Sequence, residues 1–282
     1  MKLHTALRLG RASNLPTVWT NVVAASVLAG PVPDALSLTL VCLAGSLLYE
    51  GGMFLNDAFD AEIDAKERPE RPIPSGEVGR TQVYAWGFGL LLAGVLLAFS
   101  LRASAGLAAL GTSAAIVLYN AWHKNNPASP IVMGACRMGV YAIGGFAASA
   151  SPDPALWVGG SLLLTYVLGL TYAAKFENRG GVGRWAPLLG LAAPAVWVLF
   201  TWSGAPFLRS FLGGFALWVQ RGISSIRSGK PKRIRLAIGQ LIAGMCLLDA
   251  LFVANSGSIG LAMACVAFFG VTLAFQARLS GT

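Results

Sequence analysis

The sequence predicts an all-α membrane protein, built as a bundle of helices that cross the bilayer. Of its 282 residues, 55% are hydrophobic and only 12% are charged, whereas an ordinary soluble domain carries about 25% charged residues. Its apolar runs, such as ALSLTLVCLAGSLLYEGGMFL, reach the roughly 20 residues that a crossing helix needs. Lipid offers no hydrogen bonds to the backbone, so such runs must be helical. We expect one integral membrane domain over residues 1–282.

Ten apolar segments are candidates for these helices. They lie at residues 13–31, 35–56, 82–101, 104–122, 130–150, 155–175, 185–203, 206–220, 234–253 and 257–276. The first lacks a small-x-small cleavage site, so we expect it to be retained rather than removed as a signal peptide. Segment 206–220 is short and carries Arg209, so it either crosses or lies in the membrane interface.

Lysine and arginine are concentrated in every second loop. With the N-terminus inside, the outer side receives only Arg102 and Arg209. Cytoplasmic loops of membrane proteins are enriched in both residues, so the net charge of +9 needs no nucleic-acid partner. We therefore expect a multi-pass protein of the cell inner (cytoplasmic) membrane, whose polar loops at 57–80, 123–129 and 176–184 lie on the cytoplasmic face.

The stretch NDAFDAEIDAKERPERPIPSG follows the second apolar segment. On a continuing helix, Asp57, Asp60 and Asp64 fall within an arc of roughly 60°, with Asn56 beside them. Carboxylates this close repel one another in a low-dielectric setting and need a cation. Their hard oxygens suit Mg²⁺, which prefers one or two carboxylates together with substrate phosphates. The pattern predicts a magnesium site for a phosphorylated ligand.

The second half of this stretch supplies positive charge on a stiff loop. Arg68 and Arg71 carry forked guanidinium groups suited to phosphate. Pro69, Pro72 and Pro74 end the helix and restrict the loop. The alternative is a solvated charged loop that only fixes topology. The one-face spacing beside a membrane span favours the binding site.

This stretch resembles the first aspartate-rich signature of the UbiA superfamily of intramembrane prenyltransferases. The signature reads N-D-x-x-D-x-x-x-D followed by R-P-x-x-R-P-I-P-S-G, and residues Asn56–Gly76 match it throughout. The resemblance implies usually nine transmembrane helices around a central cavity open to the cytoplasmic side. It also implies that Mg²⁺ bridges Asp57, Asp60 and Asp64 to an isoprenyl diphosphate. RASNLPTVWTN, LTYAAKFEN and LLDALF are further similar to a UbiA-like branch called EboC.

The family's second acidic signature, D-x-x-x-D or D-x-x-Y-x-x-x-D after the sixth span, is altered here. The chain reads GLTYAAKFENRGG, in which Tyr172 matches the tyrosine. Gly169 and Phe176 stand where the resemblance leads us to expect aspartates. The chain therefore departs from the family in the half of the site that would bind a second metal ion.

Two interpretations of this departure stay open. Glu177 can hold a second Mg²⁺ together with Asn178. Alternatively, Lys175 and Arg179 bind the diphosphate directly in place of that metal. Both place these residues, with Tyr172, at the diphosphate; the structural alternative is a charged helix end whose lysine and arginine only extend to the membrane interface.

The loop LYNAWHKNNPASP resembles the family's Y-x-x-x-K motif. Tyr119 matches the tyrosine, His123 stands at the lysine position, and Lys124 follows. We expect Tyr119, His123 and Lys124 at the diphosphate. His123 would either relay a proton, because its ordinary pKa lies near neutrality, or be structural.

Polar side chains within the spans indicate further functional positions, because such residues face the bundle interior. We expect Asn21 to support the aspartates or the diphosphate. Arg137 would pair with a carboxylate such as Glu50 or reach phosphate. Asp249 is either a structural partner of another polar residue or part of the acceptor pocket.

The functional prediction is Mg²⁺-dependent transfer of a prenyl group from an isoprenyl diphosphate to an aromatic, small polar or lipid acceptor within the membrane. Metal and arginine neutralise the leaving diphosphate, and an apolar chamber shields the allylic cation from water. The expected partners are the diphosphate, a small-molecule acceptor and membrane lipid. The alternatives are a transporter and a catalytically degenerate homologue that binds a phosphorylated solute.

Overall fold

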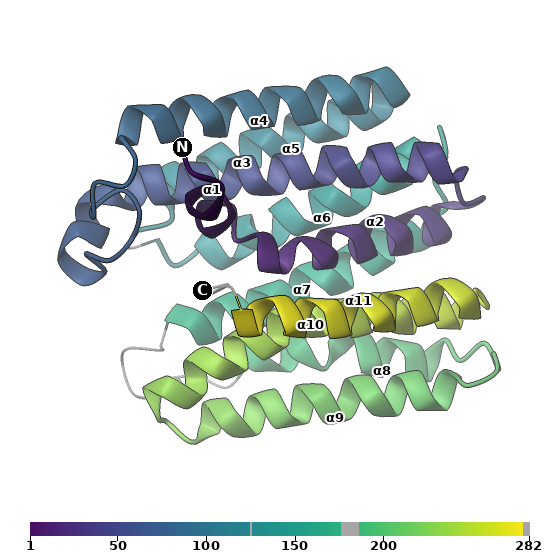
Figure 1. Ribbon diagram of the computed structural model, residues 1–282. Helices are drawn as coiled ribbons and strands as arrows, with labels where there is room; N and C mark the ends of the chain where they lie inside the picture. The colour runs from purple at the N-terminus through teal and green to yellow at the C-terminus, as the bar shows by residue number, and fades with distance from the viewer. Residues whose placement is uncertain (125, 176–185, 279–282) are drawn as a thin grey trace.

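The computed structural model describes residues 1–124, 126–175 and 186–278, and all elements in these ranges are helices (Figure 1). They are α1 (Leu3–Leu9), η1 (Ala12–Asn14), α2 (Leu15–Ala29), α3 (Ala35–Glu67), α4 (Arg80–Leu101), α5 (Ala103–Trp122), α6 (Ser129–Ala148), α7 (Ala155–Lys175), η3 (Ala186–Leu191), α8 (Ala193–Phe200), α9 (Leu208–Arg227), α10 (Pro231–Asn255) and α11 (Ile259–Arg278). The expected all-α class is confirmed.

The long helices lie side by side along one axis, and consecutive helices run in opposite directions (Figure 1). Helices adjacent in sequence pack together, such as α3 with α4 and α10 with α11, while α2 packs against both α6 and α10. The loops after α3, α5 and α9 therefore lie at one end of the bundle, and the N-terminus and the last residue of α11, Arg278, lie there too (Figure 1). We call it the charged end, because residues 68–79 and 123–124 contribute its arginine, lysine and glutamate side chains.

Each of the ten predicted segments corresponds to a helix or a broken helix. Within the described ranges, seven helices are long and apolar enough to cross a membrane: α3, α4, α5, α6, α7, α10 and α11. Segment 185–203 contains η3 and the short α8, and segment 206–220 lies in α9, which extends to Arg227. A multi-span bundle is confirmed, and the number of segments that cross stays a prediction.

Helix α3 is longer than a membrane-crossing helix needs to be, and the acidic motif lies in its C-terminal part. Its 33 residues rise roughly 50 Å, well beyond a hydrocarbon core of about 30 Å. Asp34 begins the helix by accepting hydrogen bonds from the backbone amides of Leu36 and Ser37. The helix ends at Glu67, two residues before Pro69, as the sequence predicts. The motif therefore lies on a rigid extension at the charged end.

Glycines allow α3 and α4 to pack closely. A Cβ atom added at Gly51 would lie 2.9 Å from the carbonyl oxygen of Gly87, and one added at Gly94 would lie 2.9 Å from the Leu48 side chain. Small residues are the usual means of close helix approach in membranes. This contact fixes the rotation of α3 and hence the direction of its aspartates.

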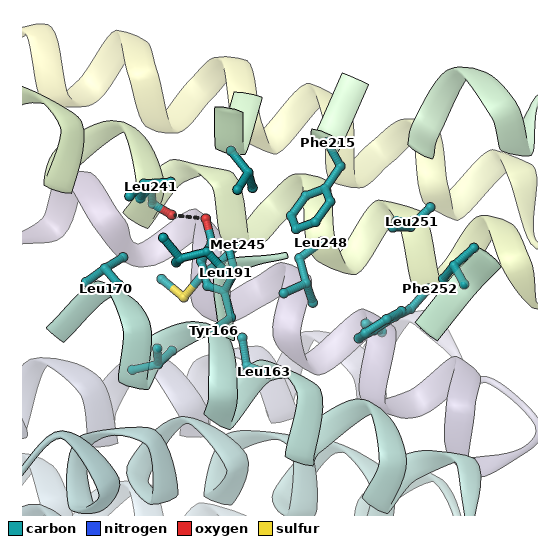
Figure 2. Close-up of a cluster of buried hydrophobic side chains, with 14 of the residues drawn as sticks. Leu163, Tyr166, Leu170, Leu191, Phe215, Leu241, Met245, Leu248, Leu251 and Phe252 are labelled. Carbon is teal, nitrogen blue, oxygen red and sulfur yellow. Dashed lines mark hydrogen bonds between the residues drawn. The ribbon is translucent and has the colours of Figure 1, made fainter. Parts of the chain in front are cut away.

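Two clusters of buried hydrophobic side chains form most of the core of the bundle. One joins α7, α9 and α10, where Tyr166 and Phe215 are fully buried and the Tyr166 hydroxyl donates to the Leu241 carbonyl at 2.8 Å (Figure 2). The other centres on Val22 and Leu48, from α2 and α3. A cavity lies among α3, α5, α6, α7 and α10, between these clusters.

Candidate functional site

The cavity has a volume of about 450 Å³, which is within the range of small-molecule sites. Its polar lining at the charged end includes Arg11, Asp57, Arg68 and Arg71. Away from that end the walls are mainly apolar, with Leu48, Ile116, Val140, Leu170, Ile242 and Met245 among the lining residues. The cavity therefore has a charged end and a mainly apolar interior.

Three buried aspartates stand on α3 beside the cavity. Asp57, Asp60 and Asp64 are each between 5% and 7% exposed. Arg71 joins two of them, because its Nη1 lies 2.7 Å from Asp64 Oδ2 and 3.3 Å from Asp57 Oδ1. Asp57 and Asp64, two turns apart on α3, thus converge on a single guanidinium nitrogen.

Arg11 adds a second cation to this end and was not among the predicted site residues. Its Nη2 donates to Asn56 Oδ1 at 3.1 Å and to Asp57 Oδ1 at 3.3 Å. Its backbone is left-handed, with φ of 45°, which turns the chain between α1 and η1. Its role could have been predicted from its position: Arg11 lies just before the first apolar segment, on the cytoplasmic face predicted for the other polar loops.

Asn56 is held from the opposite side by α5. Its Nδ2 donates to Asn120 Oδ1 at 3.1 Å, and Asn120 Nδ2 donates to the Gly52 carbonyl at 3.1 Å. Both asparagines are buried, so these bonds orient the Asn56 oxygen toward Arg11. Asn120, which lines the cavity, was also missed, although it follows Tyr119 in the second predicted motif.

Asp60 has a different set of partners. Its Oδ2 lies 3.3 Å from Lys124 Nζ and 3.5 Å from His123 Nε2. The His123 ring stacks on Tyr119 with centroids 4.9 Å apart, and Tyr119 lines the cavity. The predicted His123–Lys124 pair therefore reaches the acidic motif through Asp60.

The donor set suits a divalent cation that also binds phosphate. Within the described ranges, no three His, Cys, Asp or Glu side chains are grouped closely enough to hold a metal ion. A site made by three aspartates therefore stays a prediction. Asp57 and Asp64, however, converge on Arg71 Nη1, and Mg²⁺ needs only one or two carboxylates when phosphate oxygens complete its shell. These two residues would hold it.

Asn21 and Arg137 lie deeper than the aspartates. Arg137 lines the cavity, and its Nη1 donates to Asn21 Oδ1 at 3.2 Å, while the considered ion pair with Glu50 is not formed between these described residues. Asn21 is fully buried and donates to Asp249 Oδ2 at 2.8 Å. Among the described residues, the hydrogen bonds of Asn21 are thus to Arg137 and Asp249 and not to Asp57. Asp249 has a polar structural partner, which was one of the two roles considered for it from the sequence.

The second motif is only partly described. Tyr172 lies in α7 and packs against the α7–α9–α10 hydrophobic cluster. Lys175 is the last residue of α7. Glu177, Asn178, Phe176 and Arg179 lie outside the described residues. Their assignment to metal or diphosphate stays a prediction.

The match to known families agrees with this geometry, because residues 16–236 match the UbiA prenyltransferase family. The chain belongs to that family. Among UbiA-family relatives, a digeranylgeranylglyceryl phosphate synthase of Methanopyrus kandleri is 33% identical over 169 residues, 60% of each chain. Protoheme IX farnesyltransferase 1 of Cenarchaeum symbiosum is 37% identical over 108 residues, covering 37% of this chain and 36% of its own. The chain thus spans less than two thirds of these relatives' length.

Solved structures show the same fold. A structure from work on digeranylgeranylglyceryl phosphate synthase in membranes has a TM-score of 0.66 at 18% identity, over 90% of this chain and 98% of its own. A UbiA homologue from Archaeoglobus fulgidus bound to DMAPP and Mg²⁺ has a TM-score of 0.55 at 14% identity, over 98% of this chain and 100% of its own. The predicted family and bundle are confirmed.

Proposed function

We propose that this UbiA-family protein transfers a prenyl group from an isoprenyl diphosphate to an acceptor within the membrane, with Mg²⁺ as its cofactor. One observation carries the proposal: two buried carboxylates converge on a cation at the polar end of a cavity whose remaining walls are mainly apolar. Such a cavity matches a ligand with a charged head and a hydrocarbon tail. The names of the relatives and the DMAPP and Mg²⁺ bound by the A. fulgidus homologue support it.

The charged end would bind the diphosphate head. Asp57 and Asp64 would hold Mg²⁺, which neutralises the leaving diphosphate when bound. Arg71 and Arg11, which pair with the aspartates, and Arg68 would donate to phosphate oxygens, since guanidinium binds phosphate in a forked geometry. The two arginines that pair with the aspartates would thus also serve as ligands of the substrate.

The apolar interior would receive the prenyl chain. Residues such as Ile116, Leu170 and Met245 line it and exclude water, which would otherwise capture the allylic cation formed when the C–O bond to diphosphate breaks. The Tyr119 ring, also in the lining, can stabilise that cation through its π face. An acceptor that enters the same cavity then attacks the allylic carbon in place of water.

We further propose that the charged end faces the cytoplasm at the inner membrane. The bias of lysine and arginine toward the loops at this end supports that orientation. The acceptor would be an aromatic, small polar or lipid molecule that enters the same cavity.

Transfer of radiolabelled geranyl diphosphate by the purified protein in nanodiscs tests the proposal. Acceptors would be supplied as aromatic phenols, polyols and a membrane lipid extract, with Mg²⁺ or with EDTA. We expect Mg²⁺-dependent transfer that is lost in Asp57→Asn. Glu62→Gln is the matched control, because Glu62 lies on the same helix but is exposed and pairs with Arg80 at 2.9 Å; it should retain activity.

The binding arm of the same experiment separates the alternatives. Gly169, at a position where the family signature has aspartate, favours a homologue that binds the diphosphate without transfer. Tight Mg²⁺-dependent binding of geranyl thiodiphosphate with no product from any acceptor would support that second function. If the wild-type protein does not bind the thiodiphosphate, the proposed function is overturned.

A further inference from the structure

The cavity contains a second cationic position, remote from the acidic motif. Arg137 is half-buried on α6 and lines the cavity. Its guanidinium carbon lies 5.2 Å from the centre of the Tyr49 ring. Tyr49 precedes Asp57 by eight residues on α3, a rise of about 12 Å along the helix. Arg137 is therefore about two turns deeper in the bundle than the site proposed for the diphosphate.

This guanidinium keeps hydrogen-bonding capacity that the described residues do not use. Arginine carries five N–H donors. In the described part of the chain, the partners of Arg137 are one hydrogen bond, to Asn21 Oδ1, and the Tyr49 ring. No carboxylate in that part forms a direct ion pair with it. An arginine within a membrane bundle is costly without a partner, so its free donors face a cavity that can supply one.

A rigid network holds Arg137 in this position. Asn21 accepts from Arg137 and donates to Asp249 Oδ2 at 2.8 Å. The Tyr141 hydroxyl donates to the other oxygen of Asp249 at 2.5 Å. Asn21 and Asp249 are fully buried, and Tyr141 is 1% exposed. The side chain is thus fixed from behind by α2, α6 and α10, which leaves its open side for a ligand.

We infer that Arg137 forms the acceptor subsite and binds a carboxylate or phosphate group of the acceptor. The inference rests on the proposed function and adds the chemical class of its second substrate. A diphosphate bound at Asp57 and Arg71 cannot also reach a group two turns deeper. An acidic amphipathic acceptor fits, because its anion would meet Arg137 while its apolar body lies against Val140 and Met245, which line the same cavity.

Binding measurements on the full-length protein in nanodiscs test the subsite without requiring turnover. The probes are benzoate, phenyl phosphate and the matched neutral ligand benzyl alcohol, with geranyl thiodiphosphate plus Mg²⁺ as the donor-site probe. We expect Arg137→Met to lower the affinity for the more tightly bound of the two anions by at least about tenfold, since charge-assisted hydrogen bonds are lost. It should change thiodiphosphate affinity less than about twofold and leave benzyl alcohol binding unaffected.

A second variant and the donor probe keep the outcomes separate. Arg137→Lys preserves the charge and should lose less affinity for the anion than Arg137→Met, and it serves as the test if the methionine variant does not fold. The inference is overturned if wild-type protein binds neither anion more tightly than benzyl alcohol. It is also overturned if Arg137→Met lowers the affinity for geranyl thiodiphosphate as much as Asp57→Asn does. Failure of wild-type protein to bind thiodiphosphate would instead remove the proposed function.

Discussion

Two groups of buried carboxylates lie within the same bundle, and their partners differ in kind. At the charged end, Asp57 is 6% exposed and contacts Arg71 and Arg11, which come from the loop after α3 and the turn before α2. In the interior, Asp249 is fully buried and contacts Asn21 and Tyr141, which lie on α2 and α6. The first carboxylate is balanced by cations, and the second by neutral donors.

This difference separates a binding site from a structural network. Arginines on loops and turns can move aside and exchange one anionic partner for another, so a metal ion and a diphosphate can replace their contacts with Asp57. Neutral donors on packed helices cannot leave Asp249 without unsatisfied polar groups in the bundle, which costs free energy. We therefore expect substitutions at the charged end to affect catalysis, and substitutions around Asp249 to affect stability.

The largest expected effect is at Asp57. Asp57→Asn removes the charge needed to hold Mg²⁺ and should slow prenyl transfer by at least about 10³-fold, equivalent to roughly 4 kcal/mol of transition-state stabilisation. Thermal unfolding should change little, because asparagine preserves the shape. Initial rates and melting temperatures of the two proteins check this. A variant that retains a tenth of the wild-type rate would contradict the assignment.

A stability effect is expected at Tyr141. Tyr141→Phe removes the hydrogen bond to Asp249 and should lower the free energy of unfolding by about 1.5–3 kcal/mol, as for other bonds to charged groups. The transfer rate at saturating substrates should fall no more than about threefold. Unfolding in mixed micelles and steady-state kinetics measure both quantities. A large loss of rate at unchanged stability would show that the interior network is catalytic.

A smaller, selective effect is expected at Arg11. Arg11→Lys keeps the charge but loses the planar guanidinium, whose Nη2 donates to both Asn56 and Asp57, so the KM for isoprenyl diphosphate should rise roughly tenfold. The matched control is Arg80→Lys, which alters a surface pair with Glu62. Initial rates measured at varied diphosphate concentration give the KM of each variant. Equal KM values for the Arg11 and Arg80 variants would remove Arg11 from the site.

The smallest effect concerns the contact that positions α1. Glu77 accepts from Thr5 Oγ1 at 3.0 Å and from Arg8 Nη1 at 2.9 Å, and these bonds, that from Thr5 first, lower the pKa of Glu77 below its usual 4.5. A lowered pKa means that the contact stabilises the fold above about pH 4.5 and loses this contribution as the pH falls through the folded-state value.

Glu77→Gln tests this contact. At pH 7 the variant should melt slightly below the wild type, and the difference should shrink as the pH falls below 4.5. Melting curves between pH 3 and pH 7 provide the measurement. A difference that grows toward acid pH would mean that Glu77 contributes in its protonated form instead.

Local sequence signals predicted the helices and the first acidic motif well. The apolar runs located every long helix, and the spacing of Asp57, Asp60 and Asp64 placed them together because they share one helix. Contacts between distant segments were less accessible. Arg11 reaches Asp57 across 46 positions, and no local pattern indicates such a partner. Arg137 likewise bonds Asn21 rather than the Glu50 considered from the sequence, because partners within a bundle depend on helix rotation.

The partners of Asp60 could not be predicted from the sequence either. Equal spacing on one face suggested that all three aspartates share one cation. In the structure, the loop after α5 brings His123 and Lys124 to Asp60, and the loop after α3 brings Arg71 to the other two. Which carboxylates act together is thus decided by loops that the helical pattern does not describe.

The most direct test of the central claim is to locate the metal. Crystals grown with Mn²⁺, as an anomalously scattering substitute for Mg²⁺, and geranyl thiodiphosphate should show an anomalous peak bound by Asp57 and Asp64. The diphosphate should lie beside that peak, with the geranyl chain in the apolar cavity. A diphosphate bound elsewhere, or bound here with no metal between it and these two aspartates, would contradict the account.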